Sequence, residues 1–394
     1  MEAWDAVEAG EVAELAWPTR IVLGAGALER LPEELRRLGL QRPLVVTDPG
    51  VVRAGLAARV GEVLQVAGIA SLLFEGVQPN PTEEDVEHGL RAFREARCDG
   101  VIALGGGSAM DAGKLIQLTS THAGPLEQYD DALNGGDRIT GPLPALVAIP
   151  TTAGTGSEVG RSAVVTLRGG RRKTVIFSPL LLPRVALCDP ELTLGLPKRT
   201  SAETGMDALT HCVEAFVARG FHPLADAVAL DGMRRIARSL PVVIERGESL
   251  FARTDMMIAA MEGAMAFQKG LGAAHALAHA LTPMAGLSHG LANALVLPAV
   301  IDWNLPMATG RYARVAEALS PPAATGGAFD PALASVRVRE LALRVGIPQG
   351  LGAAGVDASA LEQIGARAFE DATHRGNPRP CDAGALTALL RAAY

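Results

Sequence analysis

The sequence is poor in the features that mark secreted, membrane and nucleic-acid-binding proteins. Its four cysteines, spread over 394 residues and without a CxxC pair, suggest neither a disulfide framework nor a thiolate zinc site. No apolar run reaches the ~20 residues that a membrane helix needs. The formal net charge of −7 offers no general attraction to nucleic acid or to an anionic membrane. The acidic start, with Glu2, Asp5 and Glu8, is unlike a signal peptide, so we expect a cytoplasmic protein.

The apolar content of the chain is enough for two folded domains. Hydrophobic residues make up 48% and charged residues 20%, which favours large cores over disorder. The length exceeds that of one typical domain, about 100–200 residues. We place the boundary where the sequence pattern changes near Pro197, so that residues 1–196 form one domain and residues 197–394 form the other.

The first half alternates short apolar runs with helical patterns. The runs predicted as strands are 43–48, 70–74, 100–104 and 145–149, and the helical patterns are 55–68 and 82–96. This alternation favours a parallel sheet that helices cover on both faces. Two further runs, 163–167 and 173–177, predict an extra strand pair joined by the basic loop 168–172.

The second half is rich in Ala, Leu and Met at helical spacing. Residues 223–238 are one example of this periodicity. Convincing strand alternation is absent from this half, and residues 321–327 are predicted to form a loop. The predicted fold is therefore a Rossmann-like α/β domain with a parallel sheet, followed by an all-α domain, with a cleft between them.

A glycine-rich turn follows one predicted strand and opens a helix. Gly105, Gly106 and Gly107 precede Ser108, and the motif ends at Lys114. Glycines let the backbone approach an anion closely, and a helix N-terminus supplies free N–H groups and a positive dipole. The turn matches neither the Walker pattern nor the GxGxxG fingerprint. The alternative is a tight strand-to-helix turn without a ligand.

Two more polar positions follow strands of the same predicted sheet. The turn at 150–158 carries the hydroxyls of Thr151, Thr152 and Thr155, which suit hydrogen bonds to phosphate or nicotinamide. Asp48 ends the run at 43–48, where a carboxylate can bind a ribose diol and would repel a 2′-phosphate. The alternative for Asp48 is an ordinary Asx turn before the next proline. Open α/β sheets bind ligands at this edge.

Histidines and an aspartate recur in apolar surroundings in the second half. Asp207 and His211 are four residues apart and share one helix face, and His275, His279 and His289 follow. Buried imidazoles need partners, and nitrogen and carboxylate ligands without thiolates suit Fe²⁺ or Zn²⁺. Spacing leaves the ligand set open, because His275 and His279 can both bind the metal and leave His289 outside. A histidine outside the set can move protons.

Together these motifs resemble the iron-containing alcohol dehydrogenase family, whose fold is also that of dehydroquinate synthase. They occur in the family's order over nearly the whole chain, at 79–82, 105–114, 150–158, 205–214, 270–279, 288–293 and 377–380. The resemblance implies an N-terminal nicotinamide-binding domain and a C-terminal helical domain for metal binding and catalysis. It implies hydride transfer between NAD(H), with NADP(H) as an alternative, and a small alcohol or aldehyde. A homodimer or a higher homo-oligomer is also implied.

The resemblance further implies roles for single residues. Asp207, His211, His275 and His289 would hold the divalent metal, with Fe²⁺ expected and Zn²⁺ as the alternative. His279 would be the catalytic histidine near substrate and nicotinamide. The residues implied to line the cofactor are Asp48, Asn80, Gly105, Gly106, Gly107, Ser108, Thr151, Thr152, Thr155, Ser162, Lys173 and Thr193.

The chain departs from the family pattern at Ser288, which precedes His289 and Gly290 where proline is usual. The ligand itself is kept, so only the stiffness of this loop is affected. Metal-free relatives such as maleylacetate reductases do not depend on this ligand set, and its presence here disfavours a metal-free mechanism. The other readings are a dehydroquinate synthase-like lyase, which recycles its NAD, and a non-catalytic metal- or nucleotide-binding protein.

Two basic residues bear on the substrate. Arg161 follows the second polar turn, and Lys269 precedes the helix with His275. If either side chain faces the cleft, the substrate is an aldehyde that carries a carboxylate, phosphonate or sulfonate. Otherwise these residues are surface or helix-end charges.

Overall fold

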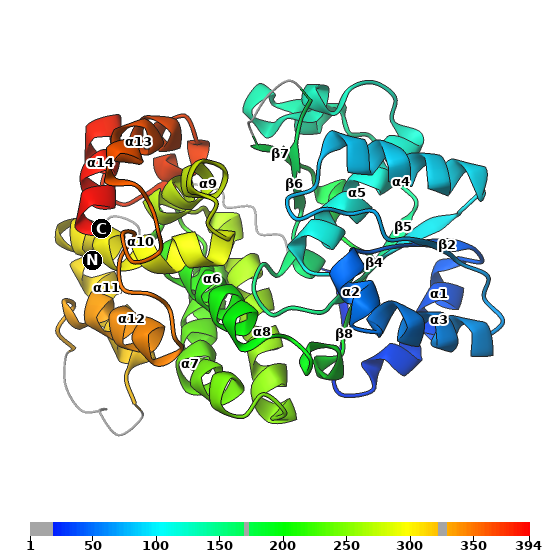
Figure 1. Cartoon of the computed structure of the whole chain (residues 1–394), viewed down its shortest axis with the longest axis horizontal. Helices are drawn as coiled ribbons and strands as arrows, with labels where there is room; N and C mark the ends of the chain where they lie inside the picture. The colour runs from blue at the N-terminus through cyan, green and yellow to red at the C-terminus, as the bar shows by residue number, and fades with distance from the viewer. Residues whose placement is uncertain (1–18, 169–172, 322–328) are drawn as a thin grey trace. The chain divides into compact units, whose positions relative to one another are not determined.

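The computed structural model describes residues 19–168, 173–321 and 329–394, which divide into two compact units (Figure 1). Among the described residues, the α/β unit comprises those within 19–152 and 156–196, and the helical unit comprises those within 153–155 and 197–394. Each unit has its own buried apolar core. Among the described helices, none combines the length and apolar character needed to cross a lipid bilayer.

The α/β unit is built on a six-stranded sheet in which all neighbouring strands are parallel. Its strands are β1 (Arg20–Leu23), β2 (Pro43–Val46), β3 (Leu72–Phe74), β4 (Gly100–Gly105), β5 (Ala145–Pro150) and β8 (Val185–Cys188). Their order across the sheet is β1-β8-β5-β4-β2-β3. The predicted strand pair is also present, as antiparallel β6 (Ser162–Thr166) and β7 (Lys173–Phe177). Of the predicted loops, 169–172 and 322–327 lie outside the described residues.

Helices cover both faces of this sheet. They are α1 (Leu31–Leu38), α2 (Pro49–Arg53), α3 (Leu56–Val66), α4 (Glu83–Glu95) and α5 (Gly107–Thr121). Side chains alternate along each strand: Val45 and Ile102 pack in the core with α1 and α3, whereas Leu44 and Val101 pack in the core with α4 and α5. The two-sided burial explains why these strands are continuous apolar runs.

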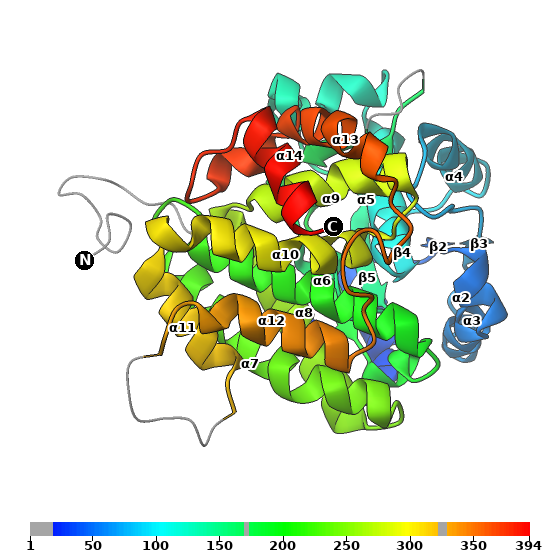
Figure 2. The same ribbon diagram turned by 60° about the vertical axis from the view of Figure 1, so that its left-hand side comes forward.

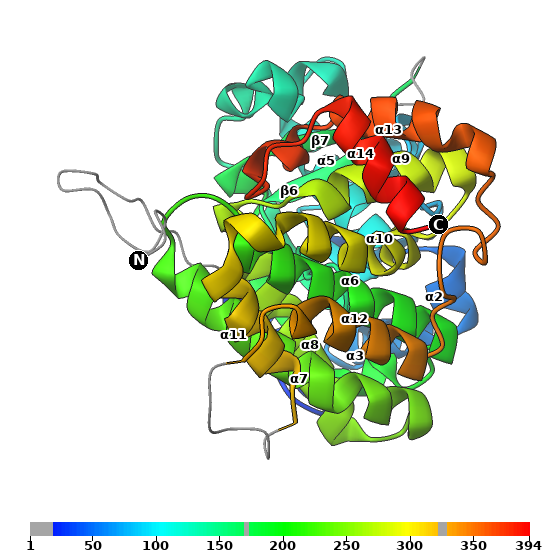
Figure 3. The same ribbon diagram turned by 90° about the vertical axis from the view of Figure 1, so that its left-hand side faces the viewer.

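The helical unit consists of nine labelled α-helices within the described residues. They are α6 (Lys198–Val217), α7 (Pro223–Glu245), α8 (Leu250–Ala266), α9 (Ala273–Ala285), α10 (His289–Asn304), α11 (Thr309–Leu319), α12 (Leu333–Arg344), α13 (Leu361–Phe369) and α14 (Ala383–Ala392). The apolar helix α6 packs against α7, α8 and α10, and α12 lies against α10 and α11 (Figure 2). The helices α13 and α14 pack together over α9 (Figure 3). The predicted fold class, an α/β region followed by an all-helical region, is confirmed.

Candidate metal centre and cofactor edge

In the α/β unit, three strand ends meet at one edge of the sheet. The strand β4 lies between β2 and β5, so Asp48, Gly105 and Thr151 follow or end neighbouring parallel strands. The chain runs from β2 outward to β3 and then returns to the other side of β2 with β4. Such a reversal of strand order leaves a crevice at the carboxyl ends of the strands, where open sheets bind ligands.

The glycine-rich turn places backbone without side chains at this edge. Gly105 has φ of 148°, and a Cβ there would lie 2.7 Å from the Ala109 Cβ and 3.3 Å from Asp48 Oδ2. The next residue, Gly106, precedes α5 and has no side chain to cap it. The first N–H groups of a 15-residue helix are therefore open to an anion, which the helix dipole also favours.

Asp48 uses its two carboxylate oxygens differently. The Oδ1 atom accepts hydrogen bonds from Gly50 N at 2.7 Å and Val51 N at 3.1 Å, so the predicted turn before Pro49 is present as the N-cap of α2. The Oδ2 atom is the one nearest Gly105. One oxygen therefore stabilises the helix while the other faces the glycine-rich turn, where a ribose diol is predicted.

Most of the other predicted cofactor residues gather around the same turn. Asn80 N donates to Ser108 Oγ at 3.3 Å, and Thr151 N donates to Gly105 O at 2.9 Å. A Cβ on Gly106 would lie 3.3 Å from the Thr152 side chain. The structure therefore brings five predicted positions together beside Gly105.

The remaining four predicted cofactor residues are Thr193, Ser162, Thr155 and Lys173. Thr193 is buried, and its hydroxyl donates to Pro190 O at 2.8 Å. Ser162 begins β6, and its carbonyl accepts from Lys114 Nζ at 2.9 Å. Thr155 belongs to the helical unit. Lys173 begins β7, but its side chain lies outside the described part of the chain. Their contacts with a cofactor stay predictions.

Lys114, at the end of the glycine-rich motif, has a structural role that its sequence position did not reveal. Its ammonium group is fully buried and donates to the carbonyls of Ser157, Gly160 and Ser162 at 2.7–3.0 Å, and to Ser157 Oγ. Burial lowers the pKa of Lys114 to about 8. The lysine therefore holds the end of the second polar turn and the residues that follow it against α5.

In the helical unit, three helices direct polar side chains to one point. The helix α6 carries Asp207 and His211 on one face, α9 carries His275 and α10 begins at His289. One ligand atom from each of Asp207, His275 and His289 lies within 4.8 Å of the others. The His211 ring stacks on His275 with centroids 4.6 Å apart, and its buried Nδ1 has no hydrogen-bond partner among the described residues.

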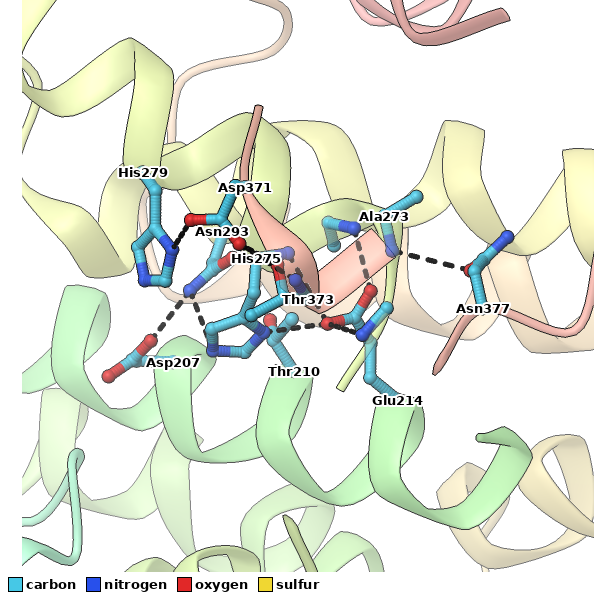
Figure 4. Close-up of polar contacts among 12 residues, drawn as sticks. Asp207, Thr210, Glu214, Ala273, His275, His279, Asn293, Asp371, Thr373 and Asn377 are labelled. Carbon is cyan, nitrogen blue, oxygen red and sulfur yellow. Dashed lines mark hydrogen bonds and ion pairs between the residues drawn. The ribbon is translucent and has the colours of Figure 1, made fainter. Parts of the chain in front are cut away.

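The contacts of the Asn293 side chain indicate whether this point suits a cation. Its Nδ2 lies 2.8 Å from Asp207 Oδ1 and 3.3 Å from His275 Nε2 (Figure 4). It also lies 3.2 Å from His289 Nε2. An amide has two N–H donors, so it cannot satisfy three acceptors at once. Three lone pairs that converge in a buried place are the arrangement that a divalent cation satisfies, and the donor set fits Fe²⁺ or Zn²⁺.

Electrostatics favour the neutral ring at two of the histidines and the ionised form of the aspartate. Burial lowers the pKa of His211 to about 4 and the pKa of His289 well below its ordinary range, so both imidazoles are neutral. At His275 burial lowers the pKa, but the hydrogen bond to Glu214 and the nearby carboxylate charges together outweigh burial and raise the pKa overall. Burial alone would raise the pKa of Asp207, yet this pKa lies below its ordinary value, and the hydrogen bond that Asn293 donates to the carboxylate contributes to the lowering. Neutral imidazoles beside a carboxylate are the forms that coordinate a metal.

His279 lies beside the cluster but faces another partner. Its Nδ1 is 2.7 Å from Asp371 Oδ2 (Figure 4), and its ring stacks on His289 with centroids 5.2 Å apart. Asp371 is in turn held by Thr373, through the backbone N at 2.8 Å and the hydroxyl at 2.6 Å. Of the two ligand sets that the spacing left open, the geometry groups His289, and not His279, with Asp207 and His275.

Three residues of this region were missed as functional candidates. Glu214 lies 2.6 Å from His275 Nδ1, Asp371 holds His279, and Asn293 reaches the cluster itself. Glu214 and Asn293 lie in motifs quoted above, and a carboxylate on the Asp207 face of α6 was the one available signal. Asp371 is 92 residues from His279 in sequence, so no local pattern could have linked them.

The two basic residues considered for substrate binding differ in their contacts. Lys269 Nζ is 2.6 Å from Asp226 Oδ1 and donates to Phe216 O at 3.0 Å, so its charge is paired with a carboxylate of the helical unit. Arg161 is half-buried and stacks on Phe177, and no carboxylate pairs with it among the described residues. Burial lowers the pKa of Arg161.

Comparisons with known proteins agree with this arrangement. Residues 18–190 match the family model described as "Iron-containing alcohol dehydrogenase", and residues 201–394 match its C-terminal counterpart. A 4-hydroxybutyrate dehydrogenase of Cupriavidus necator is 42% identical over 381 residues, which cover 94% of this chain and 97% of that protein.

Solved structures show the same likeness. A 1,3-propanediol oxidoreductase superposes with a TM-score of 0.93 at 37% identity, covering 98% of this chain and 100% of that one. A sulfoacetaldehyde reductase of Bifidobacterium kashiwanohense, solved with NAD⁺, has a TM-score of 0.86 at 27% identity and covers 98% and 99% of the two chains. Family models that match both halves of the chain, together with these relatives, show that it belongs to the iron-containing alcohol dehydrogenase family and is an oxidoreductase that acts on alcohols or aldehydes.

Proposed function

We propose that this enzyme transfers hydride between NAD(H) and a short alcohol or aldehyde with the help of a divalent metal. Residues 1–196 would form the nicotinamide-binding domain, and residues 197–394 the metal-binding and catalytic domain. The observation that carries the proposal is the convergence of Asp207, His275 and His289 in a member of a metal-dependent family.

Four side chains are proposed to hold the metal: Asp207, His211, His275 and His289. Fe²⁺ is the ion that the family implies, and Zn²⁺ suits the same donors. When bound, a divalent cation supplies a Lewis acid that favours negative charge on the substrate oxygen. The buried position of Asp207 and His275 keeps water from competing for these donors.

The edge around Gly105 is proposed to hold the dinucleotide. The open N–H groups at the start of α5 would bind its phosphates, and Asp48 Oδ2 would accept from the ribose diol. When bound, the nicotinamide gives or takes the hydride. A carboxylate at this position favours NAD(H) over NADP(H), because it repels a 2′-phosphate.

His279 is proposed as the group that moves the proton. Asp371 accepts a hydrogen bond from Nδ1, which leaves the lone pair of the neutral ring on Nε2. The histidine can then take a proton at Nε2 during alcohol oxidation and give it back during aldehyde reduction. Thr373 fixes the Asp371 carboxylate, so the ring orientation is set before substrate binds.

For the substrate we propose an alcohol or aldehyde with a terminal carboxylate, such as 4-hydroxybutyrate and its semialdehyde. Two observations support this class. A 4-hydroxybutyrate dehydrogenase is 42% identical over nearly the whole chain, and Arg161 has a guanidinium with no carboxylate partner among the described residues. A half-buried arginine of this kind is suited to bind an anion in a bidentate manner.

The test is turnover of matched neutral and anionic substrates, followed by absorbance of NADH. The proposal expects 4-hydroxybutyrate to exceed 1,3-propanediol in kcat/KM. Arg161→Gln should lower kcat/KM for the hydroxy acid about 10- to 100-fold, which corresponds to the free energy of one charged hydrogen bond. The kcat/KM for the diol should stay unchanged. The exposed Arg168 in the same region gives a matched control, Arg168→Gln. Equal losses for both substrates would contradict the role of Arg161, and no net NADH change with any substrate would contradict the reaction.

Assembly and location are part of the same proposal. The family resemblance supports a homodimer or a higher homo-oligomer, which light scattering of the purified protein would test. All four cysteines are free and buried, which supports a reducing compartment, the cytoplasm. Localisation of the tagged protein outside the cytoplasm would contradict this part.

A further inference from the structure

The helix that carries His275 has no N-cap side chain of its own. The helix α9 begins at Ala273 after Gly272, whose missing side chain cannot cap the helix. Its first N–H groups nonetheless need acceptors, because they are buried. The acceptor is the carboxylate of Glu214 on α6, which takes hydrogen bonds from Gly272 N at 3.1 Å, Ala274 N at 2.6 Å and His275 N at 3.3 Å. One helix is therefore capped by a side chain of another.

The same carboxylate also binds the imidazole ring. Glu214 Oε2 lies 2.6 Å from His275 Nδ1, and both residues are at most 2% exposed (Figure 4). A carboxylate can only accept, so the proton of the neutral ring sits on Nδ1. The lone pair is then on Nε2, the atom that faces Asn293 and the group formed with Asp207 and His289.

Close packing makes this contact possible. A Cβ on Gly272 would lie 2.7 Å from Glu214 Oε1 and 2.9 Å from Asn377 Oδ1, so a larger residue would push the carboxylate away. Glu214 also lies seven residues after Asp207 on α6, which places the two on the same helix face. A single helix therefore presents one metal-binding carboxylate and a second carboxylate that orients a ligand from α9.

We propose that Glu214 is a positioning residue for the metal centre, which sets the tautomer and orientation of His275 and thereby the affinity for a divalent cation. The inference rests on the proposed function, since it takes the cluster with Asp207 as the metal site. A carboxylate behind a histidine ligand raises the basicity of the ring and holds its direction. Glu214 performs this role while it also supplies the cap of α9, so the start of the helix and the ligand are fixed together.

The test uses the full-length protein, stripped of metal with a chelator and titrated with Zn²⁺, which does not oxidise. Glu214→Gln keeps the size of the side chain, but its amide N–H₂ can donate to Nδ1 and so favours a proton on Nε2. We expect the variant to bind Zn²⁺ about 10- to 100-fold more weakly than the parent chain. The matched control is Asn377→Ala, which removes another acceptor of the α9 terminus, on Ala273 N, but does not touch the His275 ring. It should leave zinc affinity unchanged.

A second readout uses the parent protein alone, so it does not depend on whether a variant folds. In the metal-free parent protein with ¹⁵N-labelled histidine, at mildly alkaline pH, NMR should report the Nδ1–H tautomer for His275. The Nε2–H tautomer would overturn the inference, as would parent-like zinc affinity in Glu214→Gln while Asp207→Ala loses zinc. If Asp207→Ala instead binds zinc as tightly as the parent protein, the metal site of the proposed function is wrong, and this inference fails with it.

Discussion

The helical unit and the α/β unit build their proposed binding sites from different parts of the polypeptide. At the metal centre the converging groups are side chains, and Asp207, His275 and His289 come from three helices. At the cofactor edge the groups are mainly backbone N–H and small hydroxyls, and Gly105 contributes by having no Cβ. The first site depends on the chemical identity of each residue. The second depends on backbone shape and on a helix terminus, so single side chains there should matter less.

Loss of one metal-binding side chain should give the largest effect. Asp207→Ala removes the only carboxylate of the converging group, so we expect little bound metal and a fall in kcat/KM of about 1,000-fold or more, which is ~4 kcal/mol. Metal analysis and NADH absorbance measure the two losses together. Asp302→Ala, an exposed aspartate on α10, is the control and should behave as the parent. Full metal content and turnover in Asp207→Ala would show that the cluster is not the site.

The next effect separates proton transfer from metal binding within the helical unit. Asp371→Asn weakens the acceptor that orients His279 Nδ1, so we expect kcat to fall about 100-fold while metal content stays the same. Steady-state kinetics and metal analysis check both statements. The neighbouring Glu370 is exposed and pairs with Arg367, so Glu370→Gln is a suitable control. A parent-like kcat in Asp371→Asn would show that the negative charge of Asp371 does not support proton transfer by His279.

A smaller effect is expected at the cofactor edge. Asp48→Asn keeps an oxygen that can cap α2 but removes the negative charge near Gly105. The ratio of kcat/KM with NADPH to that with NADH should rise about 10-fold, the size of one screened charge repulsion. Kinetics with both cofactors measure the ratio, and an unchanged melting temperature would show that the cap is kept. An unchanged ratio would mean that Asp48 acts only as a cap.

The smallest effect concerns Glu262, a half-buried carboxylate on α8 that lies 3.3 Å from Arg235 Nε. Burial raises the pKa of Glu262 to about 8 from its ordinary 4.5. The folded state therefore holds a proton that the unfolded state has lost, so this group destabilises the fold increasingly as pH rises from about 4.5 through about 8. Glu262→Gln should be as stable as the parent below that range and more stable above it by about 1 kcal/mol. Thermal unfolding across this pH range tests the sign, and a gain confined to low pH would contradict it.

Much of the fold follows from patterns that are visible in the sequence. The central strands were predicted within a few residues, because burial on both faces makes β2, β4 and β5 continuous apolar runs. The strands β1 and β8 were not predicted. β1 lies at the sheet edge and is mostly exposed, so it gives no apolar run. β8 is as short and as buried as β2, so its apolar run offers the same signal. The predicted helix at 223–238 continues to Glu245, because the apolar spacing persists beyond Arg238.

The candidate site was predictable where residue type alone is unusual. Buried histidines among alanines pointed to a metal without any knowledge of the fold. The supporting residues were harder to find, since carboxylates and amides are common on helices. Glu214 and Asp371 acquire their roles through contacts over 61 and 92 residues of sequence. Local spacing cannot report such pairs, because the packing of α6, α9 and the C-terminal segment creates them.

The most direct measurement is a titration of the chelated, full-length enzyme with Fe²⁺ in the absence of oxygen, with aldehyde-dependent oxidation of NADH as the signal. If four side chains hold one cation, activity should rise in proportion to the added metal and stop rising at one equivalent per chain. Full activity in the chelated enzyme, or a rise that continues well beyond one equivalent, would contradict a single catalytic metal held by Asp207 and its three histidines.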